Sequence, residues 1–305
     1  MIRPEPEPRG AMFFSPNLTG PLHIGSAVVL WLTAREARER NLRFIVNFDM
    51  NCPSVDHPGK IRRRPALADR MATMESARAA CELLNIPEVE FRFRQDYWAR
   101  YWEVFEMLKK RGSLRAVGHT HWVSMDAHFA YDRIIGPIYD VSEQVSSCYT
   151  FSQAFCALVD WWDFETPLHI RGQDIRYQSA QEQRLWRIVS EVLGDRPGME
   201  YAHIPEIFRA DHTPLHKSHE GVLKTRAGMR DDPYLFTEWA RYYDGPLARR
   251  EALEQIVLKP GADYALSNIP SDHKSAIYYD AILGIREYNP GACAETRWRE
   301  RTPGA

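Results

Sequence analysis

Apolar and polar positions change period several times along the first fifty residues. Residues 11–15 form a short apolar run, and residues 17–20 form a turn cluster. From residue 24 to about residue 40, apolar side chains recur at helical spacing with charges between them, and 43–49 (RFIVNFD) has the pattern of a buried strand. A strand, a glycine-bearing turn, a helix and a second strand predict a βαβ unit, and therefore a parallel sheet.

The same patterns continue beyond this unit. They predict helices over 65–84, 96–112 and 176–193, and a strand over 201–208. Between 113 and 165 the pattern is mixed and rich in aromatic residues, which we interpret as an insertion between two halves of the sheet domain. The last 75 residues have a helical pattern with loops and end in a polar tail.

Composition narrows the class of protein. The chain has 305 residues, 44% of them hydrophobic, and a formal net charge of -2, so it is long enough for a substantial core and has no global basic field. The five cysteines are scattered without a C-x-x-C pair, and no apolar run approaches the roughly 20 residues that span a bilayer. These features predict an ordered cytoplasmic protein that does not bind a membrane.

The most informative stretch is Ser15-Pro-Asn-Leu-Thr-Gly-Pro-Leu-His-Ile-Gly25. Gly20 permits a tight turn, and Gly25 leaves a bare surface that a planar base can approach. His23 is predicted just before the helix, where free N–H groups and the helix dipole favour phosphate. An imidazole there can donate a hydrogen bond to a phosphate whose charge grows in a transition state.

This stretch resembles the HIGH signature of class I aminoacyl-tRNA synthetases, in the variant form that ends in a small residue, here Ser26. The resemblance implies that His23 and Gly25 bind ATP, with Thr19 and Gly20 in the same turn. Ser15 and Asn17 correspond to substrate-binding positions of the glutamyl and glutaminyl enzymes.

Further segments resemble the same family in the same order over about residues 11–225. Phe48-Asp49-Met-Asn-Cys-Pro53 resembles the acidic motif that ends the second strand, which implies that Asp49 holds the α-amino group of the amino acid. Residues 95–112 resemble the helix before the acceptor-end domain, and 201–205 resemble the F-A-H-L-P strand. Arg171-Gly-Gln-Asp174 resembles the R-G-x-D loop, so Arg171 and Asp174 are expected beside the amino acid.

The second family signature is represented by Pro214-Leu-His-Lys-Ser218, which resembles the KMSKS loop in its K-L-S-K-R form. Only Leu215 and Lys217 match that form. The resemblance implies that Lys217 neutralises charge on the departing pyrophosphate, as a mobile ammonium group can do. Lys224 and Arg226 are candidates for assisting it.

One departure concerns the substrate. Where glutamyl and glutaminyl enzymes have an arginine at the start of the first strand, this chain has Phe13, and Asn47 replaces the arginine that ends the second strand. Arg171 remains available to pair with a substrate carboxylate. Because burying an anion without a cation costs free energy, the sequence predicts a substrate with a smaller or less polar side chain than glutamate.

Ordinary structural roles compete with these interpretations. His23 as a turn histidine, Asp49 as a turn cap, Arg171 as a partner of Asp174 and Lys217 as a surface lysine are the alternatives. His119, His121 and His128 cluster in the insertion, but no cysteine lies near them, so no zinc site is expected. The aromatic stripes at 98–105 and 161–162 are interpreted as packing.

The resemblance implies an α/β fold: a Rossmann-like parallel sheet split by an inserted α+β acceptor-end-like domain, followed by a short helical C-terminal region. The corresponding segments are a flexible tail at 1–10, the first half of the catalytic domain at 11–112, the insertion at 113–165, the second half at 166–230 and the C-terminal region at 231–305. It also implies a ligase that uses ATP and Mg²⁺ to activate an amino acid as its adenylate and transfers it to tRNA. Two alternatives remain open: a ligase that transfers the acyl group to a small molecule or carrier protein, and a non-catalytic binding protein.

Overall fold

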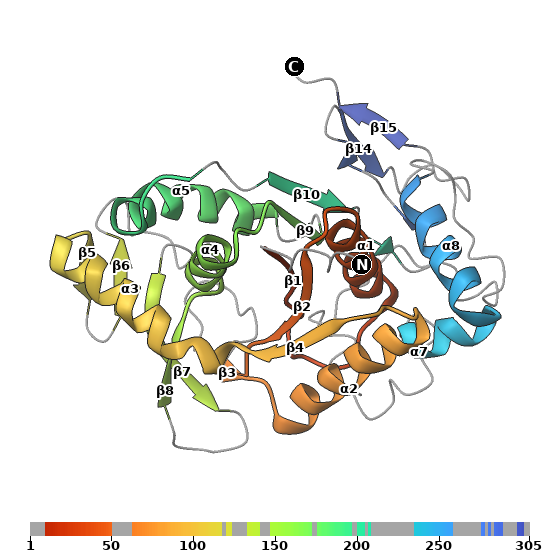
Figure 1. The fold of residues 1–305 in the computed structure, drawn as a ribbon, viewed down its shortest axis with the longest axis horizontal. Coiled ribbons are helices and arrows are strands. Elements are labelled where there is room, and N and C mark those ends of the chain that lie inside the picture. The colour runs from red at the N-terminus through yellow and green to blue at the C-terminus, as the bar shows by residue number, and fades with distance from the viewer. Residues whose placement is uncertain are drawn as a thin grey trace, which may run out of the picture.

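The structure of the chain is a computed structural model, and its arrangement is shown in Figure 1. It describes residues 10–50, 63–117, 120–123, 133–140, 147–172, 176–196, 200–204, 207–208, 235–258, 276–277, 280–281, 284–288 and 298–301. No helix in these ranges is both long enough and apolar enough to cross a membrane.

The first βαβ unit is present as predicted. Strand β1 (Ala11–Phe14) leads through a turn into helix α1 (Ile24–Glu39), which is followed by strand β2 (Arg43–Phe48). Strand β4 (Val89–Phe93) pairs on the far side of β2, giving a parallel sheet of order β1-β2-β4. The sequence analysis predicted parallel pairing of the first two strands and did not predict β4.

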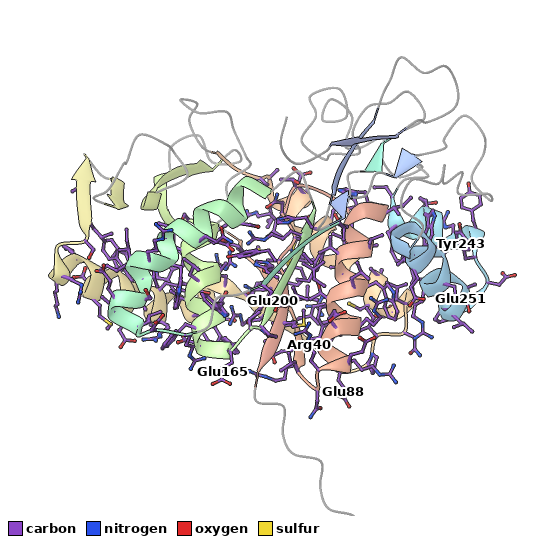
Figure 2. The ribbon with its side chains drawn as sticks, turned by 90° about the horizontal axis from the view of Figure 1, so that it is seen from above. Arg40, Glu88, Glu165, Glu200, Tyr243 and Glu251 are labelled. Carbon is purple, nitrogen blue, oxygen red and sulfur yellow. The ribbon has the colours of Figure 1, made fainter. Side chains whose placement is uncertain are left out.

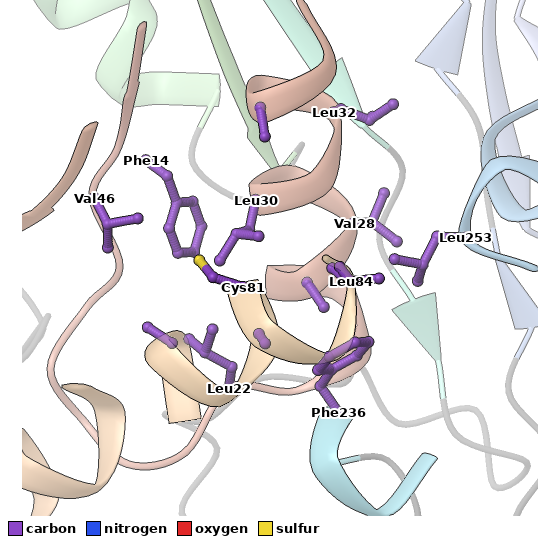
Figure 3. Packing of buried hydrophobic residues seen from close by; sticks show 14 of the residues in the cluster. Phe14, Leu22, Val28, Leu30, Leu32, Val46, Cys81, Leu84, Phe236 and Leu253 are labelled. Carbon is purple, nitrogen blue, oxygen red and sulfur yellow. The ribbon is translucent and has the colours of Figure 1, made fainter. Parts of the chain in front are cut away.

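Alternate residues of these strands face opposite layers, as the two-residue period of a strand requires. One face packs on α1 and on helix α2 (Leu67–Leu83) and forms the largest apolar cluster. Figure 3 shows Phe14 of β1 and Val46 of β2 pointing toward Leu30 of α1 and Cys81 of α2. Burial raises the pKa of the Cys81 thiol to about 12, so this cysteine is a neutral apolar side chain in the core.

The other face of the sheet packs on a second helical layer. It consists of the 3-10 helix η1 (Arg94–Tyr97) and helices α3 (Trp98–Arg111), α4 (Gln153–Phe164) and α5 (Arg176–Leu193). Tyr101, Phe105 and Leu108 of α3 are buried in a cluster with α4 and α5, whereas Trp102 is 37% exposed. The predicted apolar stripe of α3 is therefore confirmed as packing.

A second parallel pair continues the α/β arrangement. Strand β9 (Leu168–Gly172) pairs with β10 (Glu200–Ile204), and β9 also lies against β1 and α1. In Figure 2 the labelled Arg40, Glu88 and Glu165 lie toward one edge of the molecule, where α1 ends and β4 and β9 begin. The carboxyl ends of the parallel strands, and with them the predicted site, lie at the opposite edge.

Smaller sheets account for most of the remaining described strands. Strands β3 (Arg63–Arg64), β5 (Leu114–Val117), β6 (Thr120–Val123), β7 (Arg133–Asp140) and β8 (Ser147–Phe151) form one mixed sheet. Its strands β5–β8 fall within the segment interpreted as an insertion. Helix α4, which the sequence analysis placed in the same segment, packs on α3 and α5; the boundary at residue 165 stays a prediction.

The C-terminal region contains both helices and strands. Helix α7 (Phe236–Trp239), η5 (Ala240–Tyr242) and α8 (Gly245–Leu258) follow the isolated bridge at Leu235. Strand β11 (Ile207–Phe208) pairs with β12 (Ala276–Ile277), and β13 (Asp280–Ala281), β14 (Gly284–Tyr288) and β15 (Trp298–Arg301) form an antiparallel sheet. The helices expected in this region are present as α7 and α8, and its strands were not predicted.

Candidate active site

Helix α2 holds the turn that follows β1. Thr73 Oγ1 donates to the carbonyl oxygen of Gly20 at 2.6 Å and accepts the Gly20 N–H at 3.1 Å. Ser76 Oγ accepts the N–H of Leu22 at 2.9 Å. Gly20 has a φ of +126°, and no atom lies within 4 Å of the place where its Cβ would be. Two side chains of α2 thus fix the turn, and the positive φ of Gly20 is a conformation that favours glycine.

His23 is the N-cap of α1, as the sequence predicted. Its Nδ1 accepts the Ser26 N–H at 3.3 Å, and its Nε2 lies 3.2 Å from Ser26 Oγ. With Nδ1 as an acceptor, the neutral imidazole carries its proton on Nε2, which donates to the serine hydroxyl. His23 therefore stabilises the first turn of α1, and both of its ring nitrogens contact Ser26.

The two polar residues at the start of the turn have different surroundings. Asn17 Oδ1 accepts a hydrogen bond from Gln153 Nε2 of α4 at 3.1 Å, and the Asn17 carbonyl accepts the N–H of Thr19 at 2.9 Å. Ser15 is exposed at the end of β1. The predicted site residues from Phe13 to Gly25 are therefore brought together by one continuous strand–turn–helix segment.

Asp49 lies directly after β2 and is 5% exposed. Its Oδ2 accepts from Arg94 at 3.3 Å, and its Oδ1 accepts from Gln95 Nε2 at 3.0 Å. Gln95 Oε1 in turn accepts the N–H of Met50 at 3.2 Å. Both carboxylate oxygens of Asp49 thus have intramolecular partners. The expected role of Asp49 in holding the amino group of the substrate stays a prediction.

Phe13 is buried and lies among aromatic rings and a cation that the sequence analysis did not anticipate. Its ring meets that of Phe164 edge to face, with centroids 5.3 Å apart. The Arg92 guanidinium lies 5.0 Å from the centroid of Phe13 and 4.1 Å from that of Tyr97. A cation from β4 therefore lies beside the position where the glutamyl and glutaminyl enzymes have an arginine on the first strand.

Arg92 belongs to a buried network centred on Asp160 of α4. Asp160 Oδ1 accepts from Arg92 at 2.7 Å and from the Tyr101 hydroxyl at 2.8 Å. Its Oδ2 accepts from Asn47 Nδ2 at 3.4 Å and lies 3.7 Å from Arg94. With Asp49, the network contains two arginines and two aspartates, so its formal charges cancel.

The network keeps its arginines charged. Burial by itself lowers the pKa of Arg92, but Asp160 outweighs this effect and the pKa is raised. Burial also works against Arg94, and Cys156, Tyr101, Asp49 and Asp160 together hold its pKa well above the ordinary value. Burial and the Asp160 charge raise the pKa of the Tyr101 hydroxyl, which remains a donor.

Arg171 lies near the end of β9 in a second buried cluster. Its guanidinium donates to Glu182 of α5 and, at 3.2 Å, to Ser179 Oγ. Burial favours protonation of Glu182, but Arg171 and His169 outweigh it and lower the Glu182 pKa. Arg171 is thus paired with Glu182, a partner that neither sequence interpretation named.

A small cavity opens between these two clusters. Its lining combines apolar and polar side chains from β1, η1, α4 and β9: Phe13, Ser15, Arg94, Ala157, Asp160, Trp161, Thr166 and His169. Because Ser15 is exposed, the cavity reaches the surface at the end of β1, next to the turn that carries His23. The polar residues of the lining take part in the two buried clusters, and the surface that the cavity exposes is apolar.

Several predicted residues lie outside the described part of the chain. They are Asp174, Lys217, Lys224, Arg226, His119 and His128. No group of His, Cys, Asp or Glu suited to a metal ion occurs among the described residues.

Comparison with known proteins supports this reading of the fold. The chain matches the crystal structure of a glutamate tRNA ligase from Elizabethkingia meningosepticum CCUG26117 with a TM-score of 0.50 and 15% identity, over 90% of this chain and 67% of that one. The chain has the catalytic-core fold of class I aminoacyl-tRNA synthetases. A glutamate-tRNA synthetase from Elizabethkingia anophelis matches equally, with a TM-score of 0.51 and 15% identity over 90% of this chain and 68% of that one. The sequence matches no family model and no curated protein.

The sequence analysis missed Arg92, Arg94 and Asp160 as site residues. A signal for the arginines was present, because 89–94 (VEFRFR) alternates apolar and charged residues as a strand with one polar face does. No local signal distinguishes Asp160 from the partly exposed Asp163 of the same helix, because Asp160 meets its partners only through the tertiary fold.

Proposed function

We propose that this synthetase-like chain activates an amino acid with ATP as the aminoacyl adenylate and transfers the acyl group to tRNA. The observation that carries the proposal is the placement of His23 at the start of α1, after the Gly20 turn and next to a cavity that opens at Ser15. A nucleotide on the turn and an amino acid in the cavity would bring an α-phosphate and a carboxylate together.

Two displacements make up the reaction. A carboxylate oxygen of the amino acid attacks the α-phosphorus of ATP, the bond from that phosphorus to the bridging oxygen breaks, and pyrophosphate leaves. A ribose hydroxyl of tRNA then attacks the acyl carbon, loses its proton and displaces AMP. His23 Nε2 exchanges its contact with Ser26 Oγ for phosphate oxygens, to which it donates as their charge grows, and the N–H groups at the start of α1 add to this stabilisation. Lys217 is proposed to neutralise the leaving pyrophosphate.

The residues at the turn fit a triphosphate. A side chain at position 20 would stand where nothing now lies within 4 Å, so Gly20 leaves this space to a ligand. Mg²⁺ is expected to bind mainly through the phosphates of ATP and to offset their charge. Asp49 and Asp160 are already paired with arginines in the fold.

ATP–pyrophosphate exchange across the amino acids tests the proposal. His23→Asn is the sharpest variant, because asparagine is a good N-cap and replaces the cap without the imidazole donor. We expect the exchange rate to fall by about 100- to 1000-fold, the effect of losing one donor aimed at developing charge, with little change in the melting temperature. Exchange at the wild-type rate in this variant would remove His23 from the chemistry.

Acyl transfer needs a separate measurement. The full chain is incubated with radiolabelled ATP, the amino acid that supports exchange, and total tRNA, and the release of AMP and the formation of acyl-tRNA are followed. Adenylate formation without acyl-tRNA would favour a small-molecule or carrier-protein acceptor. ATP binding without any exchange would favour the non-catalytic alternative.

A further inference from the structure

Three polar side chains lie on the buried side of helix α2. Arg70, Thr73 and Ser76 are at most 8% exposed and follow one another at intervals of three residues. The helix is anchored in the apolar core by its other buried side chains, which are Met74, Ala77, Ala80 and Cys81. Because polar side chains are buried only where they have partners, the partners of these three residues indicate their role.

Thr73 binds both backbone polar groups of Gly20. Its hydroxyl has one proton, and two carbonyl oxygens are within reach: that of Gly20 at 2.6 Å and that of Asp69, one helical turn earlier, at 3.0 Å. The same oxygen accepts the Gly20 N–H at 3.1 Å. Thr33 of α1 shows the usual arrangement, because its hydroxyl donates to the Val29 carbonyl four residues earlier. The shortest contact of Thr73 instead crosses 53 positions of sequence to the turn.

Ser76 binds the same turn two residues further along. Its oxygen accepts the Leu22 N–H at 2.9 Å, and its proton goes to the Thr73 carbonyl at 3.0 Å. Three backbone groups between Gly20 and Leu22 are therefore bound by side chains of α2, directly before His23. A helix that is packed in the core places such partners more precisely than a loop does, so α2 fixes the direction in which α1 begins.

Arg70 extends these contacts to the second strand. Its Nη1 donates to the carbonyl oxygen of Met50, the residue after Asp49, at 3.2 Å. The Met50 N–H donates to Gln95, which also bonds Asp49. One helix thus bonds to both segments that are expected to bind substrates: the turn before His23 for ATP, and the chain at Asp49 for the amino acid.

We propose, on the basis of the adenylation function above, that α2 is the positioning helix of the site. Thr73 and Ser76 set the turn that presents His23 to ATP, and Arg70 sets the chain at Asp49 for the amino acid. These residues act through the segments that they hold. Because the reacting atoms of the two substrates must lie about 3–3.5 Å apart, a rigid link between the two segments favours the reaction.

Pyrophosphate exchange with and without the Thr73 hydroxyl tests the first part. Thr73→Val removes the hydroxyl at nearly constant shape, and we expect kcat to fall by about 100-fold because the turn is no longer fixed. Thr73→Ser retains the hydroxyl and should restore most of the rate. Thr33→Val is the matched control, because it removes a buried hydroxyl that bonds within α1, and it should leave kcat unchanged. All rates are measured below the lowest melting temperature of the set.

Two further measurements separate positioning from a loss of folding. Ser76→Ala removes a single bond to the turn and should lower kcat by about tenfold, and it decides the question if Thr73→Val does not fold. A double-mutant cycle combines Thr73→Val with His23→Asn. If Thr73 acts through His23, its substitution has little further effect in the His23→Asn variant. Effects that multiply in full overturn this role.

Arg70→Met tests the link to the second strand. It removes the donor to Met50 and keeps an apolar side chain, so we expect the KM for the amino acid to rise by about tenfold and the KM for ATP to change less. Arg249→Met is the control, because Arg249 Nη1 donates to the carbonyl oxygen of Leu83 at the other end of α2, at 3.1 Å. Equal changes of KM in the two variants overturn the link.

Titration calorimetry with ATP and Mg²⁺ separates this inference from the proposed function. Wild-type exchange that persists unchanged in Thr73→Val and Ser76→Ala overturns the positioning role and leaves adenylation intact. If the wild type shows no exchange, but ATP binds more weakly to Thr73→Val than to Thr33→Val, the role of α2 at the turn is supported and the proposed function is overturned. Equal ATP affinities of these two variants overturn the positioning of the turn, and an absence of ATP binding to the wild type overturns both.

Discussion

The two faces of the sheet β1-β2-β4 are made from alternate residues of the same three strands and differ in chemistry. Toward α1 and α2, residues such as Phe14, Val46 and Phe48 form an apolar core. Toward η1, α3 and α4, the strands present Asn47 and Arg92, which join a buried network with Asp160, beside a small apolar cluster that includes Phe13. The apolar core tolerates substitutions that conserve volume, whereas Asn47 and Arg92 need particular partners.

We call α1, α2 and the sheet face that packs on them the apolar layer, and η1, α3, α4 and the face with Asn47 and Arg92 the polar layer. The two layers have different roles. The apolar layer holds α1 and α2 against the sheet, and through Thr73 and Ser76 it also fixes the turn that carries His23. The polar layer surrounds the cavity and keeps Arg94 charged and oriented by Asp49. Substitutions of apolar side chains on the first layer should therefore change stability, and substitutions on the second should change stability and substrate selection together.

The largest expected effect comes from breaking the polar layer at its centre. Asp160→Asn removes the charge that balances Arg92 while nearly preserving shape. Because it leaves a buried cation without its partner, we expect the free energy of unfolding to fall by about 3–5 kcal/mol. Urea denaturation measures the change.

A matched control lies on the same helix. Asp163 is partly exposed and pairs with Arg100 at 2.9 Å. Asp163→Asn should cost less than about 1 kcal/mol, as exposed ion pairs usually contribute little. If the two substitutions cost the same, the Asp160 network does not hold the second layer together.

A substitution that creates a cavity in the apolar layer should lower the free energy of unfolding as much as Asp160→Asn does, or less. It should not change the selectivity among amino acids. Leu30 of α1 is fully buried, and Figure 3 shows it between β1 and α2. Leu30→Ala should lower the free energy of unfolding by about 2–5 kcal/mol. Leu247→Ala, at a position that is 62% exposed, should change it by no more than about 0.5 kcal/mol. A changed ranking of amino acids in Leu30→Ala would contradict the separation of the two layers.

The smallest effect is a dependence of stability on pH that belongs to the polar layer. The pKa of His169 is lowered from 6.5 by burial and by Arg171. As pH falls below 6.5, the unfolded chain binds a proton that the folded chain does not, so the free energy of unfolding decreases. The lowered pKa of Glu182 acts in the same direction below its ordinary value of 4.5.

Urea denaturation at pH 7.5 and pH 5.5 measures this dependence. His169→Gln should show a smaller decrease between the two pH values than the wild type, because its side chain does not titrate. Leu30→Ala, which alters the apolar layer, should keep the wild-type decrease. Equal decreases in the wild type and His169→Gln would show that His169 titrates alike in the folded and unfolded chains.

Local sequence was sufficient for the elements whose signals are short in range. The first βαβ unit, the helices α2, α3 and α5, and the position of His23 before α1 all follow from apolar period and turn residues. They could be predicted because a helix makes its contacts within four residues, and a glycine-bearing turn has its own backbone preference. The family resemblance of residues 15–25 likewise needs no tertiary information.

The pairings that define the cavity were decided by the tertiary structure alone. Arg92 and Asp160 are 68 positions apart in sequence, and Asn47 and Asp160 are 113 apart. The partner of Arg171 proved to be Glu182, one helix further along the chain. A charged residue carries no local mark of the partner that will neutralise it, because that choice depends on which strands and helices pack together. The sequence by itself thus determined where ATP is expected to bind, whereas only the packed fold placed a charge-balanced network and a small cavity beside Phe13.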